Sequence, residues 1–289
     1  MRSNTGCKLM HKLLRLAALA PLMLCFPAAH AQTELRPEWE VGAGFAAIDF
    51  PVYRGASDRR SYLLPIPYFV YNGEVLQINR ERVRGLIFRS DSVELDVSVN
   101  GSVPANSKDS SARSGMPDLD ATLEVGPSLN VHFYYSEDQK TNFDMRLPLR
   151  SVTASDFNRF QNAGWLFQPQ LNLDIRDIAH SGWNLGLVAS MIFSDQRYNQ
   201  YFYDVQPQYV TATRPAYSAN GGYAGTQFIA ALSKRHDGYW MGGFIKWDDL
   251  SGAVFADSPL VQTRQYFTVG FAATWVFDKS DKMVAVSYD

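Results

Sequence analysis

Residues 122–150 read TLEVGPSLNVHFYYSEDQKTNFDMRLPLR, and this stretch decides the fold class. On both sides of a polar turn at 136–140, apolar and polar residues alternate with a period of two, which is the pattern of β-strands. Each arm holds roughly 10–14 residues, enough to cross a bilayer at a tilt, whereas globular strands hold about 5–6. One face of each arm is apolar and the other carries charge. This favours a transmembrane barrel over a long hairpin in a soluble β-sandwich.

The N-terminus has the layout of a secretory signal peptide. Basic residues precede and enter an apolar run at 13–26, and residues 29–31 read Ala-His-Ala, a small-residue cleavage site. The run is shorter than the roughly 20 residues that a spanning helix needs, which disfavours a membrane anchor. We expect export with cleavage after Ala31. That leaves a barrel over 32–277 and a segment, 278–289, that is either a periplasmic tail or an extra strand.

Cysteine usage and charge narrow the function further. Cys7 and Cys25 both lie in the predicted signal peptide, so the exported chain has no thiol chemistry. The signal holds four basic and no acidic residues, which lowers the 27 basic residues of the whole chain to 23, against 29 acidic ones. This balance excludes a basic nucleic-acid-binding protein. After residue 32 no apolar run reaches helix-spanning length, so the chain can be embedded in a membrane only as a closed barrel.

Turn signals divide the rest of the chain into twelve strand-like segments. Asn72-Gly73 is a dipeptide typical of a type I′ hairpin. Short and long connections alternate, as in outer-membrane barrels with short periplasmic turns and long extracellular loops. We therefore expect an all-β, antiparallel transmembrane barrel of twelve strands, with ten or fourteen as alternatives. The expected strands are 39–48, 62–71, 74–80, 85–89, 93–99, 122–135, 141–150, 165–175, 183–193, 223–233, 239–248 and 264–277.

Prolines and one long connection are harder to fit to this pattern. Pro127, Pro148 and Pro169 fall within expected strands, where each removes a backbone donor. Because a closed barrel has no free edge, we expect β-bulges at these three positions. The tyrosine-rich span 195–222 is expected to be a loop.

Arginines crowd the first third of the predicted barrel. They either line a lumen and bind anions, meet lipopolysaccharide phosphates at the outer rim, or pair with interior carboxylates such as Glu94, Asp96, Glu124 and Asp144. A narrow lumen favours charge pairing. The arginines are Arg54, Arg59, Arg60 and the four candidate lumen or anion-contact residues Arg80, Arg82, Arg84 and Arg89.

Ser128, Asn130 and His132 share one strand face, and a serine esterase needs a nucleophile, a base and an orienting group. Residues two apart on a strand lie about 6–7 Å apart, which we take as too far for direct hydrogen bonds. We assign no catalytic residue and expect ordinary lumen polarity. The remaining histidines are far apart and no glycine-rich phosphate loop is present, so we expect no metal and no cofactor.

Several segments together resemble the MltA-interacting protein family, MipA/OmpV, of Gram-negative outer membranes. The closing strand also looks like a barrel-assembly signal, with Trp275 and Phe277 in its third-last and last places and Ala272 where glycine is usual. The segment after Phe277 departs from the family pattern. The matching segments are PVYRGAS at 51–57, LPIPY at 64–68, Gly221-Gly222, DSPLV at 257–261 and GFAATWVF at 270–277.

The resemblance implies an outer-membrane barrel that is not an enzyme. In the best-known member it implies a scaffold joining a lytic transglycosylase to a bifunctional penicillin-binding protein, and other members are linked to osmotic or antibiotic stress and to host adhesion. These two murein enzymes, together with outer-membrane lipid and lipopolysaccharide, are the expected partners. The alternatives are a small pore, a barrel for anion or antibiotic binding or for adhesion, and an outer-membrane hydrolase.

Two of the family motifs lie in the loops before the second and twelfth strands. In a closed barrel the first strand pairs with the twelfth, so these loops become neighbours at the extracellular rim. We expect a structural latch that closes this mouth, with murein enzymes docking at the periplasmic turns or the 278–289 tail. The residues assigned to the latch are Tyr53, Arg54, Gly55, Pro65, Pro67, Ser258 and Pro259.

Overall fold

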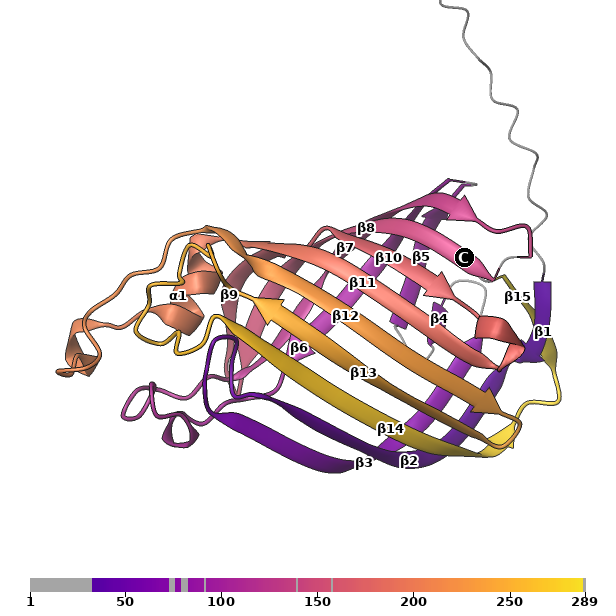
Figure 1. Cartoon of the computed structure of the whole chain (residues 1–289), viewed down its shortest axis with the longest axis horizontal. Coiled ribbons are helices and arrows are strands. Elements are labelled where there is room, and N and C mark those ends of the chain that lie inside the picture. The colour runs from indigo at the N-terminus through magenta and orange to yellow at the C-terminus, as the bar shows by residue number, and fades with distance from the viewer. Residues whose placement is uncertain are drawn as a thin grey trace, which may run out of the picture. The chain divides into compact units, whose positions relative to one another are not determined.

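Strands dominate the part of the chain that the computed structural model describes, which comprises residues 33–72, 76–78, 83–90, 92–138, 140–156 and 158–287 (Figure 1). The predicted signal peptide, Gly73, Arg80 and Arg82 lie outside these residues. The strands are β1 (Thr33–Pro37), β2 (Trp39–Pro51), β3 (Arg59–Asn72), β4 (Leu76–Ile78), β5 (Val83–Arg89), β6 (Val93–Ser102), β7 (Ala121–Tyr135), β8 (Thr141–Ser155), β9 (Phe160–Phe167), β10 (Gln170–Ile175), β11 (Trp183–Ser194), β12 (Gly222–His236), β13 (Tyr239–Asp249), β14 (Gln265–Lys279) and β15 (Met283–Ser287).

The main sheet closes on itself. Its order is β10-β11-β12-β13-β14-β2-β3-β4-β5-β6-β7-β8-β9, and further pairings join β10 to β8 and β9 to β11. β9 and β10 are two halves of one strand, because Leu149 pairs with Phe167 and Arg146 with Gln170 in the same register along β8. Counted in this way the sheet is a twelve-stranded antiparallel barrel. The predicted fold is confirmed.

The two faces of the wall are inverted relative to a soluble protein. In β7 the side chains of Leu123 and Leu129 are exposed on the outer face, whereas Glu124 and Asn130 are buried on the inner one. The same arrangement recurs in β14, where Phe267 and Phe271 are exposed and Thr268 is buried. Apolar residues outside and polar residues inside are what a barrel in lipid requires.

The bulges that we expected at the strand prolines are absent, and that prediction is wrong. The pairing of β7 with β8 keeps one register across Pro127 and Pro148, and β9 and β10 keep theirs across Pro169. One of the bulges lies instead between His132 and Tyr134. A slip of one residue would turn every following side chain to the other face, so a local gap in the ladder is the less costly solution.

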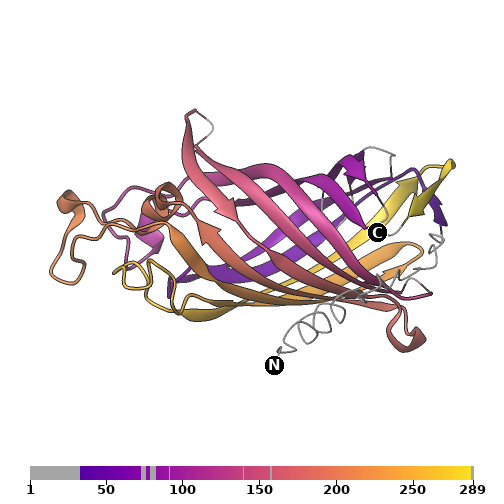
Figure 2. The ribbon, with the colours of Figure 1, turned by 90° about the horizontal axis from the view of Figure 1, so that it is seen from above.

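Long loops gather at one end of the barrel and short turns at the other; we call these the loop end and the turn end (Figures 1 and 2). After β11 the chain forms a helix, α1 (Gln196–Tyr203), where we had expected only loop. The Asp195 side chain caps it by accepting a hydrogen bond from the Tyr198 backbone N–H at 2.9 Å. Among the described residues no helix is both long and apolar enough to cross a membrane.

The two ends of the described chain pair with each other. β1 and β15 form a separate two-stranded antiparallel sheet in which Thr33 lies opposite Ser287 and Pro37 opposite Met283. Backbone hydrogen bonds from Glu38 to Lys282 and from Ser280 to Trp39 join this ribbon to the barrel, each at 2.9 Å. The segment after Phe277 therefore completes β14 and adds one more strand.

Candidate functional site

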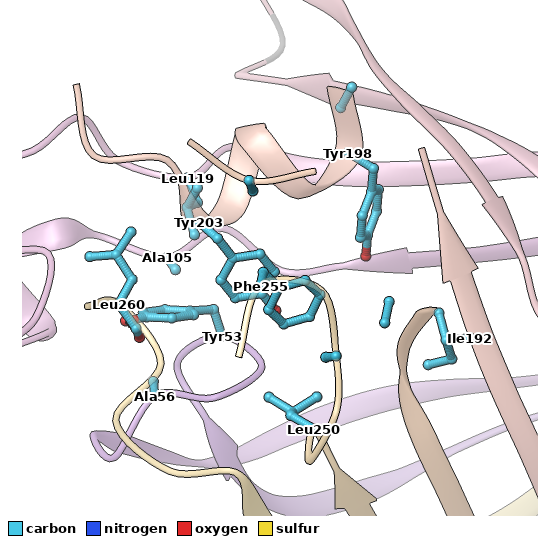
Figure 3. Packing of buried hydrophobic residues seen from close by; sticks show 14 of the residues in the cluster. Tyr53, Ala56, Ala105, Leu119, Ile192, Tyr198, Tyr203, Leu250, Phe255 and Leu260 are labelled. Atoms are coloured by element: carbon cyan, nitrogen blue, oxygen red, sulfur yellow. The ribbon is translucent and has the colours of Figure 1, made fainter. Parts of the chain in front are cut away.

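An apolar core fills the loop end of the barrel (Figure 3). It is assembled from the β2–β3 loop, the β6–β7 loop, α1 with the segment that follows it, and the β13–β14 loop. At its centre the Phe255 ring stacks on Tyr203, with centroids 3.7 Å apart and ring planes 9° apart. Burial raises the pKa of the Tyr203 phenol well above its usual value, which keeps this side chain neutral.

The structure brings the two motif-bearing loops together within this core. The Tyr53 hydroxyl donates to the Leu260 carbonyl at 2.7 Å. The backbone N–H groups of Gln262 and Thr263 both donate to the Gly55 carbonyl, at 2.7 and 3.0 Å. Gly55 has a φ of +90°, a conformation that other residues adopt only under strain. The contact thus depends on the sequence at both loops.

Helix α1 is tied into the same contact. The Ser258 hydroxyl donates to the Tyr203 carbonyl at 2.8 Å, and the Tyr203 hydroxyl donates to the Arg54 carbonyl at 3.1 Å. Pro259 lies next to these groups in the same loop. Pro65 and Pro67, which we had assigned to the same latch, lie instead in the wall, on β3 opposite Phe45 and Ala43 of β2.

A buried polar network runs around the inner wall of the barrel below this core. Its hydrogen bonds and ion pairs pass from the β2–β3 loop through β13, β12 and the β9–β10 break to β8 and β7, and they pair each charge along the way. The links are Arg54 Nε to Asp248 Oδ1 at 3.4 Å, Gln227 Nε2 to Asp248 Oδ1 at 2.6 Å, Gln168 Nε2 to Gln227 Oε1 at 3.1 Å, Arg150 Nη2 to Gln168 Oε1 at 2.5 Å and Arg150 Nε to Glu124 Oε2 at 3.0 Å.

Two of the interior carboxylates that we named pair with arginines from a different part of the chain than the sequence suggested. Glu124 pairs with Arg150, and Asp144 accepts a hydrogen bond from Arg146 at 2.7 Å; both arginines belong to β8. Of the described arginines of the first third, Arg54 does pair with an interior carboxylate, Asp248. Arg59 bonds to Asp49, and Arg60 bonds to Asp109 at the loop end.

Comparison with known families now identifies the chain. The family model described as MltA-interacting protein MipA matches residues 41–277. The chain belongs to the MipA family.

Two solved structures are similar to this MipA-family barrel at low sequence identity. An outer membrane channel from Pseudomonas putida F1 has 10% sequence identity and a TM-score of 0.39, covering 85% of this chain and 97% of the channel. The toluene transporter TbuX from Ralstonia pickettii also has 10% identity, with a TM-score of 0.28, and covers 86% of this chain and 72% of the transporter. A search of curated proteins gives no match. Membership of the MipA family and the closed sheet with its apolar outer face make this chain an outer-membrane barrel.

The candidate lumen arginines of the MipA-family barrel stay a prediction. Arg84 and Arg89 lie on β5. Arg80 and Arg82 fall outside the described residues.

The serine, asparagine and histidine of β7 are closer than we expected. The Ser128 hydroxyl donates to the Asn130 amide oxygen at 2.9 Å, so our expectation that such side chains lie too far apart for a direct hydrogen bond is wrong. Side chains that lean along a strand close this distance. The His132 ring packs on Tyr135, with centroids 5.4 Å apart. Because an amide oxygen accepts the serine proton, this arrangement does not activate Ser128 as a nucleophile.

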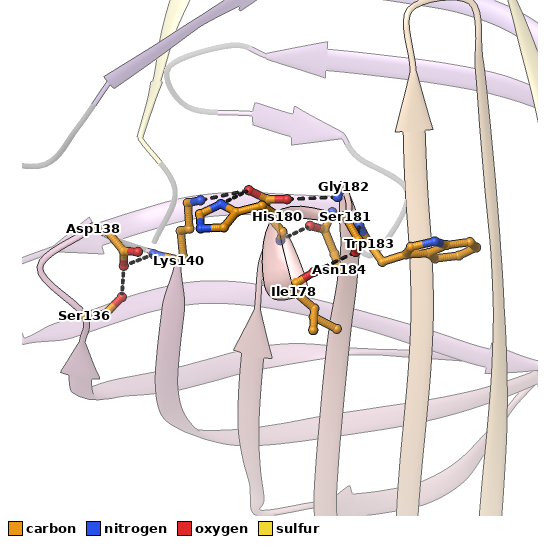
Figure 4. Close-up of polar contacts among 10 residues, drawn as sticks. Ser136, Asp138, Lys140, Ile178, His180, Ser181, Gly182, Trp183 and Asn184 are labelled. Carbon is orange, nitrogen blue, oxygen red and sulfur yellow. Dashed lines mark hydrogen bonds and ion pairs between the residues drawn. The ribbon is translucent and has the colours of Figure 1, made fainter.

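The turn end carries a different kind of structure (Figure 4). Lys140 Nζ lies 2.8 Å from Asp177 Oδ2, and Asp177 Oδ1 accepts the Gly182 N–H at 2.9 Å. The hydrogen bonds from Lys140 and Gly182 lower the pKa of Asp177 to about 2. These contacts join the β7–β8 and β10–β11 turns.

The β10–β11 turn is also strained. Asp177, Ala179 and His180 have φ values of 51°, 49° and 58°, in the left-handed region that non-glycine residues rarely adopt. Each such residue costs on the order of 1–3 kcal/mol, and such residues cluster at functional sites. The His180 side chain is 88% exposed. Sequence reasoning found this turn but not its conformation, because Asp177 and His180 are residue types that tolerate positive φ without requiring it.

Proposed function

We propose that this barrel is a non-enzymatic outer-membrane scaffold that holds murein enzymes at its turn end. The observation that carries the proposal is the contrast between the two ends. The loop end is filled by a buried core, whereas the turn end presents a strained turn braced by Lys140 and Asp177, with His180 exposed. A braced, exposed turn keeps a fixed shape for a partner without first having to be ordered.

Orientation in the membrane supports docking at the turn end. In outer-membrane barrels the short turns face the periplasm, where murein lies, and the long loops face outward. The β1–β15 ribbon leaves the barrel at this same end, beside Trp39. The docking surface of the proposal therefore consists of the β7–β8 and β10–β11 turns and this ribbon.

Family membership suggests which enzymes would bind. The family description names an interaction with MltA. The resemblance to MipA/OmpV adds that this partner is a lytic transglycosylase and that a bifunctional penicillin-binding protein joins the same assembly. We propose both as partners. A barrel that held them together would place murein cleavage next to murein synthesis.

A conducting pore is the competing function, and the geometry argues against it. The apolar core packs at the loop end, and the polar network lines the inner wall below it. We therefore expect the purified barrel to be silent in a planar-bilayer conductance measurement. A stable open channel in the unmodified protein would favour the pore.

Co-purification from crosslinked envelopes tests the scaffold. We expect the unmodified barrel to recover a murein hydrolase and a murein synthase. Lys140→Met and Asp177→Asn, which break the turn-end brace, should lower this recovery several-fold. The matched control is Arg264→Ala, which breaks an exposed ion pair to Asp257 at the loop end and should leave recovery unchanged. The scaffold is ruled out if the unmodified barrel recovers no murein enzyme, and turn-end docking if only the loop-end variant loses its partners.

A further inference from the structure

Part of the barrel wall lacks strand pairing among the residues that the structure describes. β3 pairs with β2 along its whole length, but on its other side the pairs with β4 among the described residues are Tyr71 with Ile78 and Asn72 with Gln77. β6 pairs with β7 up to Ser102, but with β5 only up to Val97. The cause is that only the 20 residues 73–92 connect β3 to β6, too few for two more strands as long as β3 with its 14 residues. The upper parts of β3 and β6 therefore face each other with no described strand between them.

This interval is bounded on four sides, and we call it the window. β3 and β6 form its two sides, and the paired residues of β4 and β5 lie toward the turn end. Toward the loop end, Arg60 Nη1 donates to the Pro104 carbonyl at 3.3 Å, and the Ser111 N–H donates to Asp58 Oδ2 at 2.7 Å. The β6–β7 loop thus crosses the top of the window and holds its two sides together.

Side-chain exposure along β3 agrees with an opening at this place. The Tyr68 hydroxyl donates to Glu40 Oε2 at 2.9 Å, and both residues are buried, so the even-numbered residues of β3 point inward. Tyr68 is 4% exposed near the paired end of β3, whereas Leu64, which also points inward, is 48% exposed. Leu64 is thus far less covered than Tyr68, which lies on the same face of the same strand.

The backbone at the β3 side of the window is poor in hydrogen-bond donors. The Asn72 N–H donates to the Glu38 carbonyl at 2.8 Å, so backbone groups of even-numbered residues face β2 and those of odd-numbered residues face the window. Pro65 and Pro67 are odd-numbered and have no N–H. A free edge ordinarily recruits another strand, and prolines prevent this. They also reduce the unsatisfied polar groups that lipid would meet.

The inner wall beside the window is apolar and lined by small residues. Leu64 lies opposite Ala46 of β2, and Tyr62 lies opposite Ile48. Ala46 in turn pairs with Ala272 of β14, and Ile48 with Gly270. Small side chains leave room next to Leu64 that larger ones would fill.

The β6 side of the window is polar by contrast. Glu94 and Asp96 are buried on the inner face of β6, and Asn100, on the same face, is exposed at the window. The two sides together match a molecule with an apolar chain and a polar head.

From this arrangement we propose that the window is a lateral passage, through which a single-chain amphiphile moves between the membrane and the lumen. The chain would lie along β2 and β3, and the head would face the polar residues of β6. Entry along the barrel axis is blocked at the loop end by the apolar core, so the wall is the open route. This passage does not depend on the murein scaffold, because it uses neither the turns nor the β1–β15 ribbon.

Photolabelling of the unmodified, folded barrel tests the passage directly. The probe is a palmitic acid that carries a diazirine in its chain, added to phosphatidylcholine vesicles that hold the protein; adducts are located by mass spectrometry. We expect adducts on the inward residues Leu64, Ile66 and Ile48 as well as on the outward Leu63, which is 72% exposed. Adducts confined to outward residues would mean that the wall is sealed, and the proposal would be wrong.

A matched pair of variants tests the route. Leu64→Trp narrows the window from inside and should lower the label on Ile48 several-fold, whereas Leu63→Trp enlarges an outward side chain and should not. Equal labelling of Ile48 in both variants would show entry elsewhere and overturn the window. A single Leu63→Cys substitution tests whether β3 pairs with a second copy of the chain. It introduces a unique cysteine into the barrel, since no cysteine follows Cys25. Disulfide dimers formed through it in the membrane would show that β3 pairs with a second copy, which also overturns the passage.

Discussion

The loop end and the turn end of this barrel are held together by different forces. At the loop end, segments far apart in sequence bury their side chains against one another, as Tyr203 and Phe255 do. At the turn end the contacts are exposed and ionic, and part of the backbone is strained. Burial of a large apolar side chain contributes about 1.5–3 kcal/mol, whereas an exposed ion pair contributes about 0–1 kcal/mol. Most of the stability should therefore lie at the loop end, and the turn end should be free to serve binding.

The largest effect is expected from Phe255→Ala. It removes a fully buried ring and its stacking on Tyr203, so we expect a loss of about 4 kcal/mol in the free energy of unfolding. Urea unfolding in detergent micelles, together with the heat-modifiable gel band, measures it. The control is Phe267→Ala, which removes an outward ring and should cost much less. If the two variants unfold at the same urea concentration, the core does not hold the loop end.

Arg150→Met should have the next largest effect. It leaves Glu124 buried without its ion-pair partner, which typically costs about 3 kcal/mol. Adding Glu124→Gln removes the uncompensated charge and should restore most of that loss, again measured by urea unfolding. A double variant no more stable than the single one would mean that Arg150 acts mainly through Gln168.

Tyr53→Phe should cost about 1 kcal/mol, since it removes only the hydrogen bond to the Leu260 carbonyl and leaves the ring in place. Tyr53→Ala and Pro259→Ala should impair heat resistance more strongly, because they also remove packing within the latch. These three variants should keep their murein-enzyme recovery once folded. A folded Tyr53→Ala barrel that has lost its partners would reverse the assignment of the two ends.

The smallest effect concerns the pH dependence of the turn-end brace. The pKa of Asp177 is lowered in the folded protein, to about 2 from 3.8, so its contribution is fully present above pH 3.8 and is lost as the pH falls through 2. Carbon-detected NMR titration of the Asp177 carboxyl group should show a midpoint near 2. In Lys140→Met the midpoint should move up toward the ordinary value. An unchanged midpoint would mean that Lys140 is not the cause.

Most strands of the barrel wall could be predicted from the sequence, but the packing of the loops at the loop end could not. Strand periodicity depends on neighbouring residues, so each of the twelve expected segments contains a strand, down to the short β4. Helix α1 was missed although its Asp195 cap is a readable signal and Tyr198, Tyr201 and Phe202 recur at helical spacing, because eight residues are too few for periodicity alone to indicate a helix. The stacking of Tyr203 on Phe255 joins two loops, and no local pattern predicts such a partner.

The candidate site was likewise predictable only in part. Closure of the barrel was enough to predict that the loops of Tyr53 and Ser258 are neighbours, and in the structure these loops do contact each other. The partners of Glu124 and Asp144 were not predictable, since the choice between arginines of the first third and those of β8 depends on strand tilt and register. Likewise, part of β3 has no described partner strand because the connection between β3 and β6 is short. The alternation of apolar and polar residues does not reveal this.

The β1–β15 ribbon has a consequence for how the molecule is made. Its partners are separated by almost the whole chain, as is the seam between β2 and β14. Neither pairing can form until the C-terminal strands are present. Until then the edges of the first strands stay unpaired. Such long-range closure is slow and exposes the chain to aggregation. A chain cut short by even its final two strands would lack both the seam and the ribbon, which makes completion of translation a checkpoint for assembly.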